Sequence, residues 1–335
     1  MAVETATERQ LGREAAVAMR AVAEAIDLVR QVERHVAAGV LSKSDASPVT
    51  VADFGVQTVV AARLSRDFPS DPLVAEEDAS VLRTSPDVSA RVVDLVRCAG
   101  VDRGSHQVWD LIDRGRGKPG RRCWTLDPID GTKGLLRGGQ YAIALALIVD
   151  GAVQLGVLGC PRLSLARRST GDPASLAGAT GGVAVAVRGC GAWWSAGADA
   201  TLVRLSVSCV SDATRARVLH SFERSHSDVK ALQRVIHSLG VSRPPSLMDS
   251  QAKHVVIAGA VADILLRFPP RGFHDAIWDQ AAGSILIEEA GGRVTDLAGR
   301  ALDFSTGRHL SRNDGLIATN GVLHESVVEA VQRAR

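Results

Sequence analysis

The stretch Trp124-Thr-Leu-Asp-Pro-Ile-Asp-Gly-Thr-Lys133 holds two carboxylates, Asp127 and Asp130, which are followed at once by Gly131-Thr132. Oxygen ligands of this kind suit Mg²⁺, which proteins usually bind through a few carboxylates together with substrate phosphate. Backbone N–H groups at a turn that leads into a helix suit the phosphate. The same residues also fit an ordinary acidic surface turn, because Asp-Pro and Asp-Gly are common turn dipeptides. The rest of the chain has to decide between these two interpretations.

The residues on either side of the motif predict its local structure. Cys123 to Leu126 are typical of the end of a strand, and Lys133 to Leu136 can open a short helical turn. We therefore expect the two carboxylates at the point where a strand gives way to a helix.

The composition is that of a globular protein. Apolar residues make up 46% of the 335 residues and charged residues 23%, in a chain long enough for one large or two medium domains. Aromatic residues are only 4%, so alanine and valine must build much of the core. The formal net charge is +2 and no long basic run occurs, which argues against a nucleic-acid polymer as a partner.

Several features favour an intracellular, reducing compartment. The cysteines are dispersed and lack metal-type spacing: Cys98, Cys123, Cys160, Cys190 and Cys209. The longest apolar run, Tyr141 to Val149, is far too short to span a membrane, so no membrane partner is expected. The start of the chain shows no basic-then-apolar signal pattern, and Glu4 and Glu8 interrupt any transit-peptide pattern. We expect a cytoplasmic protein, with a plastid or mitochondrion as the alternative if a transit peptide was removed.

Residues 1–210 are expected to form an α+β domain. Hydrophobic periodicity predicts three helical segments, over 8–38, from Asp53 to Phe68 and over 81–97. The first is one helix or a broken pair of helices, and it should stop at Gly39. Apolar runs predict strands at 73–75, 141–149, 152–157, 182–187 and 201–207. The second and third of these strands should form a hairpin around Asp150-Gly151. Residues 102–122, rich in arginine and glycine, are expected to be a loop.

Residues 211–335 are expected to form an α/β domain, because strands and helices alternate there. The predicted strands are 217–222, 262–267 and 293–296, and the predicted helices are 228–239, 250–260 and 279–290. Gly291-Gly292 closes the last of these helices. No linker separates the two halves, so the boundary near residue 210 rests on this change of pattern alone.

Further acidic residues stand at the ends of predicted elements: Asp53, Glu76 and Asp279. Each has an ordinary explanation, since Asp279 would be a good helix N-cap and Glu76 fits a solvated strand end. If they converge with Asp127 and Asp130, however, their charges repel one another unless cations neutralise them. A site with several Mg²⁺ ions does this, and it supports in-line hydrolysis of a phosphate ester.

Such a reaction needs a group that accepts a proton from the attacking water. Thr132, two residues after Asp130, can act together with Asp53 in this role. Two other classes of enzyme are not supported, because the sequence has neither a G-x-x-x-x-G-K-[ST] P-loop nor a G-x-S-x-G nucleophile elbow.

Together, these residues resemble the lithium-sensitive, magnesium-dependent phosphatase superfamily. It includes inositol monophosphatases, fructose-1,6-bisphosphatases, inositol polyphosphate 1-phosphatases and 3′(2′),5′-bisphosphate nucleotidases. The similarity is greatest to the bisphosphate nucleotidases of the yeast and plant type, and it covers essentially the whole chain. It is carried by the acidic positions above and by these stretches: Ser47-Pro-Val-Thr-Val-Ala-Asp53, Gly156-Val-Leu-Gly-Cys-Pro161, Val187-Arg-Gly189 and Met248-Asp-Ser-Gln-Ala-Lys253.

The resemblance implies the layered α/β/α/β/α sandwich of the inositol monophosphatases and a role for each matching residue. The implied ligands of two or three Mg²⁺ ions are Glu76, Asp127, Asp130, Asp279 and the carbonyl group of Ile129. Asp53 and Thr132 would activate the water, while Gly131 and Thr132 would meet the scissile phosphate through their amides. The implied nucleotide-binding residues are His226, Ser250, Lys253 and Arg267.

The implied reaction removes the 3′-phosphate of 3′-phosphoadenosine 5′-phosphate to give AMP, with 3′-phosphoadenylyl sulfate as a second substrate. The expected partner is therefore a small bisphosphate nucleotide, and the expected protein is a monomer or weak homodimer. An inositol polyphosphate 1-phosphatase or other inositol phosphatase is the alternative enzyme, and a redox-regulated nucleotide-binding sensor is the non-enzymatic alternative. One departure concerns Ser225-His226-Ser227-Asp228, where the family often has a longer His-Ser-Ser-His-Asp run.

Overall fold

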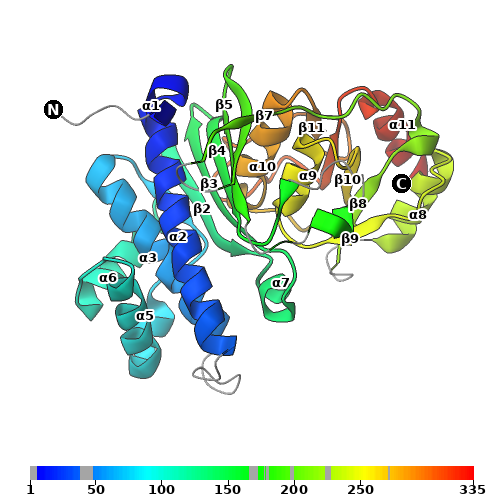
Figure 1. The fold of residues 1–335 in the computed structure, drawn as a ribbon. Coiled ribbons are helices and arrows are strands. Elements are labelled where there is room, and N and C mark those ends of the chain that lie inside the picture. The colour runs from blue at the N-terminus through cyan, green and yellow to red at the C-terminus, as the bar shows by residue number, and fades with distance from the viewer. Residues whose placement is uncertain are drawn as a thin grey trace.

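Two β-sheets alternate with layers of helices in the order helix, sheet, helix, sheet, helix (Figure 1). The structure is a computed structural model that describes residues 6–37, 48–165, 173–176, 178, 181–196, 200–222, 228–270 and 272–335. Hydrophobic clusters fill both faces of the first sheet and the outer side of the second. The layered α/β/α/β/α sandwich expected from the sequence is therefore confirmed.

The helices of the described ranges are α1 (Ala6–Leu11), α2 (Arg13–Ala37), α3 (Pro48–Asp67), α4 (Ser80–Thr84), α5 (Pro86–Cys98), α6 (Ser105–Asp113), α7 (Thr132–Arg137), α8 (Val229–Ser238), α9 (Ala252–Ala258), α10 (Ile277–Glu289) and α11 (His324–Ala334), with the 3₁₀ turns η2 (Pro173–Leu176) and η3 (Ala213–Arg215). The strands are β1 (Leu73–Ala75), β2 (Arg122–Asp130), β3 (Ala142–Val149), β4 (Ala152–Cys160), β5 (Gly182–Val187), β6 (Gly191–Ser195), β7 (Val203–Leu205), β8 (Val218–Ser221), β9 (Ser246–Met248), β10 (Ile264–Arg267), β11 (Arg293–Thr295) and β12 (Leu316–Thr319). None of the described helices combines the length and the apolar character needed to cross a membrane.

The first sheet has the strand order β1-β2-β3-β4-β5-β6-β7. Its first two strands are parallel and the others pair antiparallel. Both faces are buried, and in β3 they differ in size: Ala144 and Ala146 face the middle helices, whereas Leu145 and Leu147 face the first helical layer. The small side chains on one face let α10 lie close to the sheet.

Glycines let β4 touch a helix on each of its faces. A Cβ at Gly156 would lie 2.6 Å from a side-chain carbon of Ile285 and 2.7 Å from the carbonyl oxygen of Ala282, both in α10. A Cβ at Gly159 would lie 2.5 Å from a side-chain carbon of Val22 in α2. These contacts set the distance of α2 and α10 from the sheet.

The helices of the first layer begin at different residues from those expected. The segment 8–38 was expected to be one helix or a broken pair of helices, and the second alternative is correct. α1 and α2 are separated at Gly12, whose φ is +90°. The predicted stop at Gly39 lies outside the described residues. α3 begins at Pro48 instead of Asp53, so Asp53 lies buried inside the helix. Proline suits the first helical position because its missing N–H is not needed there.

Two predictions in the next segment are wrong in detail. The helix over 81–97 is two helices, α4 and α5, because Pro86 starts a new one. The predicted loop 102–122 contains α6, in which Val108 and Ile112 are buried on one face. Arginines and glycines around this short helix hide its periodicity in the sequence.

β2 runs through the acidic motif instead of ending before it. Its pairing with β3 shifts register between Asp127 and Asp130, which places Pro128 in a bulge. A bulge is one of the few places where a strand accepts proline. The short helix after the motif and the hairpin of β3 and β4 are confirmed, and Asp150 and Gly151 in the hairpin turn have φ of 50° and 76°.

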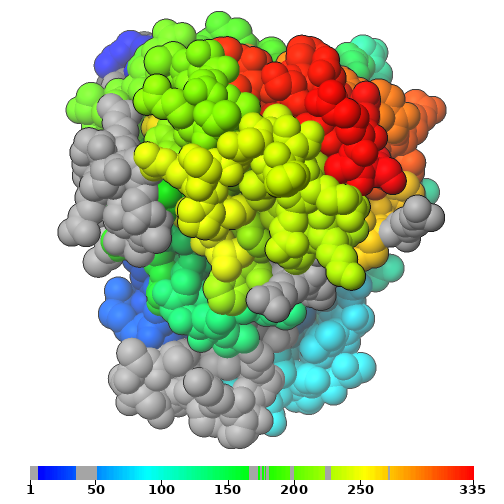
Figure 2. Space-filling model, turned by 90° about the vertical axis from the view of Figure 1, so that its right-hand side faces the viewer, coloured from blue at the N-terminus to red at the C-terminus, as the bar shows by residue number. Residues whose placement is uncertain are grey.

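The second sheet has the strand order β11-β12-β10-β8-β9. β8 runs parallel to its neighbours β10 and β9, whereas β12 runs antiparallel to its neighbours β10 and β11. The half that was expected to be α/β therefore contains a mixed sheet. Figure 2 shows α8 in yellow-green beside α11 in red on the outer face. β6, β9 and β12 have no predicted counterpart, because runs of three to five residues show little periodicity. α11 is also missing from the prediction, although Val327 and Val331 form a buried helical face.

The middle helix α10 joins the two halves, because it packs against strands of both sheets. The first sheet ends with β7 at Leu205, and the second begins with β8 at Val218. The division into domains 1–210 and 211–335 stays a prediction.

We expect Gly156→Ala to destabilise the protein, because the added methyl group overlaps the backbone of α10 at Ala282. Overpacking of this kind costs ~1–3 kcal/mol. The measurement is the midpoint of thermal unfolding by circular dichroism. Gly120→Ala is the matched control, since Gly120 is exposed and the nearest atom to a Cβ there is 4.0 Å away. Equal stability of the two variants would contradict the close contact between β4 and α10.

Candidate active site

The acidic motif lies where the first sheet meets the second half of the chain. Asp127 is only 3% exposed, and its Oδ1 has no hydrogen-bond partner among the described residues. Asp130 ends β2, and Gly131 then takes a φ of +86°, a conformation that favours glycine. α7 begins at the next residue, Thr132. The two carboxylates therefore stand just before a sharp turn into a helix.

A segment of the second half docks on this turn. A Cβ at Gly131 would lie 2.8 Å from the Cβ of Ser250, so only glycine leaves room for the approach. Ser250 has a φ of +62°, which is strained for a residue with a side chain. The backbone N–H of Gln251 donates to the carboxylate of Asp130, 121 residues away in the sequence. The end of β2 and the segment before α9 therefore form one unit.

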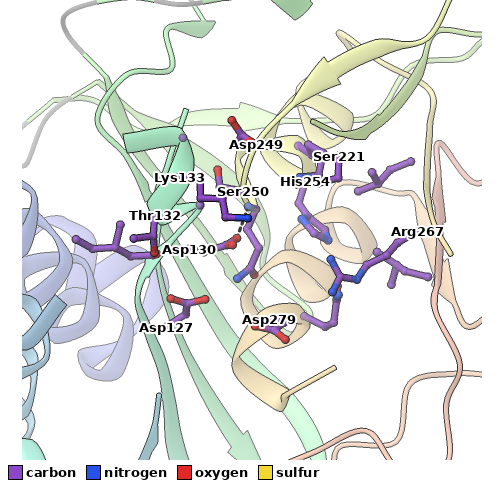
Figure 3. A pocket seen from close by; sticks show the side chains of 18 of the residues that line it. Asp127, Asp130, Thr132, Lys133, Ser221, Asp249, Ser250, His254, Arg267 and Asp279 are labelled. Atoms are coloured by element: carbon purple, nitrogen blue, oxygen red, sulfur yellow. Dashed lines mark hydrogen bonds between the residues drawn. The ribbon is translucent and has the colours of Figure 1, made fainter. Parts of the chain in front are cut away.

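A cavity of ≈ 350 Å³ opens beside this contact (Figure 3). Figure 3 shows Asp127 and Asp279 converging from β2 and α10, with Arg267 across the cavity from Thr132. The predicted site residues that line it are Glu76, Asp127, Ile129, Asp130, Gly131, Thr132, Ser250, Lys253, Arg267 and Asp279. Asp53 does not line it, and His226 lies outside the described residues.

The carboxylates in this cavity lie close enough to raise one another's pKa. Burial, and then the charges of Glu76 and Asp130, raise the pKa of Asp127 well above its usual value. Burial also raises the pKa of Glu76, although a hydrogen bond with Asp127 opposes it. Burial, and then the charges of Asp275 and Asp130, raise the pKa of Asp279 to about 8. Without a cation, these carboxyl groups therefore retain protons at a pH where ordinary carboxyl groups have lost them.

Glu76 directly follows β1, and α3 holds the next residue, Glu77. Gln57 of α3 donates to the carbonyl oxygen of Glu77 at 2.7 Å, and its side-chain oxygen accepts the N–H of Glu77 at 3.1 Å. Asp53 lies one turn earlier in the same helix. Its pKa is raised by burial first, and then by the charges of Glu77 and Glu76. Asp53 is therefore next to the acidic cluster, although it is set back from the cavity.

Asp279 is not the N-cap that its place in the sequence suggests. α10 starts at Ile277 after the cap residue Ala276, so Asp279 is the third residue of the helix. Its carboxylate accepts the N–H of Ala276 at 2.9 Å. This hydrogen bond holds the side chain at the start of α10, toward β2.

The hydroxyl of Thr132 makes a different contact from the expected one. It donates to the carbonyl oxygen of Ile129 at 3.0 Å, whereas the sequence suggested a pair with Asp53. α3 and α7, which carry Asp53 and Thr132, do pack near one another. The two groups are thus on neighbouring elements without a direct hydrogen bond.

Lys253 and Arg267 bring positive charge to the cavity. The Nζ of Lys253 donates to the carbonyl oxygen of Met248 at 3.2 Å. Burial, opposed by the charge of Asp130, lowers the pKa of Lys253 to about 8. Arg267 forms a salt bridge with Asp275 at 2.7 Å, while its Nε is buried and has no hydrogen-bond partner in the part of the chain that is described. Both residues line the cavity.

A model of the inositol monophosphatase family matches residues 11–335. The chain belongs to this family. Among its curated relatives, the 3′(2′),5′-bisphosphate nucleotidase of Oryza sativa is 42% identical, over 96% of this chain and 94% of the relative. The 3′(2′),5′-bisphosphate nucleotidase of Emericella nidulans is 38% identical, over 96% of this chain and 98% of the relative.

Solved structures of the family share the fold. Mycobacterium tuberculosis SuhB aligns with a TM-score of 0.63 at 21% identity, covering 97% of this chain and 98% of its own. The inositol monophosphatase of Anabaena aligns with a TM-score of 0.61 at 21% identity, covering 96% and 95%. The sandwich is therefore the inositol monophosphatase fold, as the resemblance implied.

Phosphatases of the inositol monophosphatase family depend on a metal, generally Mg²⁺. The described His, Cys, Asp and Glu side chains include no group of three or more already arranged around a metal position. The donor set nevertheless fits the ion, because Asp127 offers a buried oxygen without a partner and a divalent cation relieves the repulsion among buried carboxylates. The groups that could hold it are Glu76, Asp127, Asp130, Asp279 and the carbonyl of Ile129.

The cavity also contains side chains to which the sequence assigned no role: Ser221, Asp249, His254, Phe273 and Gln280. Asp249 belongs to the stretch Met248–Lys253 that carries the resemblance, so that signal could have found it. The others stand singly in ordinary helices, strands or loops, where no pattern in one sequence marks them.

We expect Mg²⁺ to stabilise this family member more at about pH 8.5 than at about pH 6. The folded-state pKa of Asp279 is about 8, above that of an unfolded carboxyl group, so the metal-free fold loses a stabilising contribution as the pH rises through this value. Bound Mg²⁺ replaces the lost protons. The measurement is the difference in unfolding midpoint with and without Mg²⁺ at each pH, in which titrating groups away from the metal site cancel. In Asp279→Asn, the stabilisation by Mg²⁺ should change less between the two pH values than it does in the wild type. Equal stabilisation of the wild type at both pH values would contradict the prediction.

Proposed function

We propose that this protein is a Mg²⁺-dependent 3′(2′),5′-bisphosphate nucleotidase, which hydrolyses 3′-phosphoadenosine 5′-phosphate to AMP and phosphate. One observation carries the proposal: the acidic cluster and the cations Lys253 and Arg267 share one cavity. Such a cavity fits a substrate with two separated phosphates, one at the metal ions and one at the basic side chains. The similarity to relatives named 3′(2′),5′-bisphosphate nucleotidase supports the same substrate. 3′-Phosphoadenylyl sulfate has the same 3′-phosphate and is a second proposed substrate.

The proposed metal ligands are Glu76, Asp127, Asp130, Asp279 and the Ile129 carbonyl, and we propose that they hold two or three Mg²⁺ ions. When bound, Mg²⁺ supplies charge that stabilises the attacking and leaving oxygens and lowers the pKa of water. The Thr132 hydroxyl is proposed to accept the proton of the attacking water while it passes its own proton toward the carboxylate of Asp53, which ends protonated. The backbone amides of Gly131 and Thr132 are proposed to hold the scissile phosphate, and the 3′-oxygen leaves as a hydroxyl group after it takes a proton from solvent water.

The second phosphate and the nucleoside are proposed to bind in the other half of the cavity. Lys253 and the unpartnered Nε of Arg267 are the donors for the phosphate, through charge-assisted hydrogen bonds. Ser250, held at a positive φ beside Gly131, is proposed to contact the same part of the nucleotide. His226 is proposed as a further nucleotide contact on the strength of the resemblance alone.

The cellular setting is also a proposal. All five cysteines are free thiols, with Cys123 and Cys160 buried, which supports a reducing compartment such as the cytoplasm. We propose that the enzyme acts there as a monomer or weak homodimer.

Phosphate release from a panel of substrates with Mg²⁺ tests the function. We expect turnover of the bisphosphate nucleotide to exceed that of inositol 1,4-bisphosphate, inositol 1-phosphate and fructose 1,6-bisphosphate. Asp130→Asn should lower turnover by more than ~10²-fold, because a metal ligand loses its charge. Asp94→Asn is the control, since Asp94 is exposed on α5. Preference for an inositol phosphate would make the chain an inositol phosphatase, and tight nucleotide binding without turnover would make it a sensor.

Lys253→Met should separate nucleotide recognition from phosphate chemistry. Methionine keeps most of the buried volume of the lysine but removes its charge. Loss of one charge-assisted hydrogen bond, ~1.5–3 kcal/mol, should raise KM for the bisphosphate nucleotide about 10- to 100-fold. Hydrolysis of a small phosphomonoester such as p-nitrophenyl phosphate should change much less. The same loss on both substrates would instead place Lys253 at the scissile phosphate, next to Asp130.

A further inference from the structure

Arg308 lies in the loop before β12 and reaches across to the first sheet. Its Nη2 donates to the carbonyl oxygen of Ala75 at 2.6 Å, and its Nη1 donates to the carbonyl oxygen of Gly115 at 3.0 Å. The guanidinium also lies over the ring of Trp278, 4.8 Å from its centroid. One side chain thus joins the end of β1, the loop after α6 and the start of α10.

These contacts fall next to two of the proposed metal ligands. Ala75 is the residue before Glu76, and Trp278 is the residue before Asp279. The hydrogen bonds of Arg308 go to backbone carbonyls instead of the carboxylates themselves. Any influence on the metal site must therefore pass through the backbone that carries Glu76 and Asp279.

The backbone of the same loop is tied to the start of α10. The carbonyl oxygen of Arg308 accepts the N–H of Ile277 at 3.0 Å, and His309 forms an antiparallel bridge with Ala276. Ala276 in turn donates its N–H to the carboxylate of Asp279 at 2.9 Å. The position of the loop and the orientation of this carboxylate are therefore linked.

The end of β1 is held just as closely. The carbonyl oxygen of Gly115 accepts the N–H of Ala75 at 2.8 Å as well as the guanidinium N–H. A Cβ at Gly115 would lie 2.9 Å from the Cβ of Ala75, so the two segments are in close contact. Since α3 holds the residue after Glu76, this ligand lies between two fixed neighbours.

We propose that Arg308 is a positioning residue, which sets the separation of Glu76 and Asp279 and so determines how tightly the site binds its metal ions. The inference rests on the metal-dependent phosphatase function proposed above. Groups that orient metal ligands in other proteins change metal affinity or activity about 10- to 100-fold when they are replaced.

The charge of Arg308 and its hydrogen-bond geometry predict opposite effects on metal affinity when the residue is replaced. By charge alone, removal of a cation near a metal site strengthens metal binding. If Arg308 positions the ligands, its removal weakens metal binding. Lysine keeps the charge but lacks the planar fork that reaches two carbonyls while it stacks on a ring. Arg308→Lys and Arg308→Ala should therefore both weaken metal binding.

The experiment titrates the protein with Mn²⁺ alone and monitors binding through the electron paramagnetic resonance signal of the free ion. Thermal unfolding without metal confirms that each variant is folded. We expect the Kd for Mn²⁺ to rise about tenfold or more in both Arg308 variants. Arg188→Lys is the matched control, because Arg188 also holds a carbonyl, that of Val153, and pairs with Glu288 at the far end of α10. Its Kd should equal that of the wild type.

A double variant shows whether the effect passes through Glu76. In a Glu76→Gln background, Arg308→Lys should weaken Mn²⁺ binding less than it does in the wild type, because coupled residues are not additive. The positioning role is overturned by unchanged Kd values in the Arg308 variants, by tighter binding in Arg308→Ala, by an equal effect of Arg188→Lys, or by a full effect in the Glu76→Gln background. Wild-type protein that binds no Mn²⁺ would overturn the inference and the proposed function together, whereas the other outcomes leave the function standing.

Discussion

Repulsion among buried carboxylates is the constraint on which the rest of this molecule depends. Asp127 and Asp130 come from the end of β2, Glu76 from the residue after β1, and Asp279 from the first turn of α10. A carboxylate is costly to bury as a lone anion: burial, and then the charges of Glu76, Asp130 and Asp279, raise the pKa of Asp127. The fold has to hold these carboxylates together against their own repulsion until a bound cation neutralises it.

The layered packing resists this repulsion. α10 lies against the alanine-rich face of the first sheet and touches Gly156, while its other contacts reach the second sheet. Ser250 and Gln251 close on Gly131 and Asp130 from the second half of the chain. The site is therefore built where two sheets share a helix. Both halves must be in place before Asp279 meets the carboxylates of the first half, and the loop that carries Arg308 contacts both.

The part of the site that local sequence pattern alone predicts is centred on one short motif, whereas Ser250, Lys253 and Arg267 follow only from the resemblance. Asp127, Asp130 and Gly131 are neighbours in sequence, so the local backbone alone brings them together. Glu76 could be added because it stands at the end of a recognisable strand, but its meeting with Asp127 requires β1 to pair with β2, which periodicity does not show. Arg308 carries no local pattern, since its partners lie far away in the chain.

The sequence by itself determined most of the helices and strands, the acidic motif and the preference for a hard cation, because these follow from local periodicity and from the chemistry of carboxylate oxygens. Only the tertiary structure decided that Asp53 lies inside α3, that Asp279 is the third residue of α10, and that Arg267 pairs with Asp275. The physical reason is that the partner of a side chain is chosen by the packing of elements distant in sequence. A single sequence carries the periodicity of each element but no direct record of which elements touch.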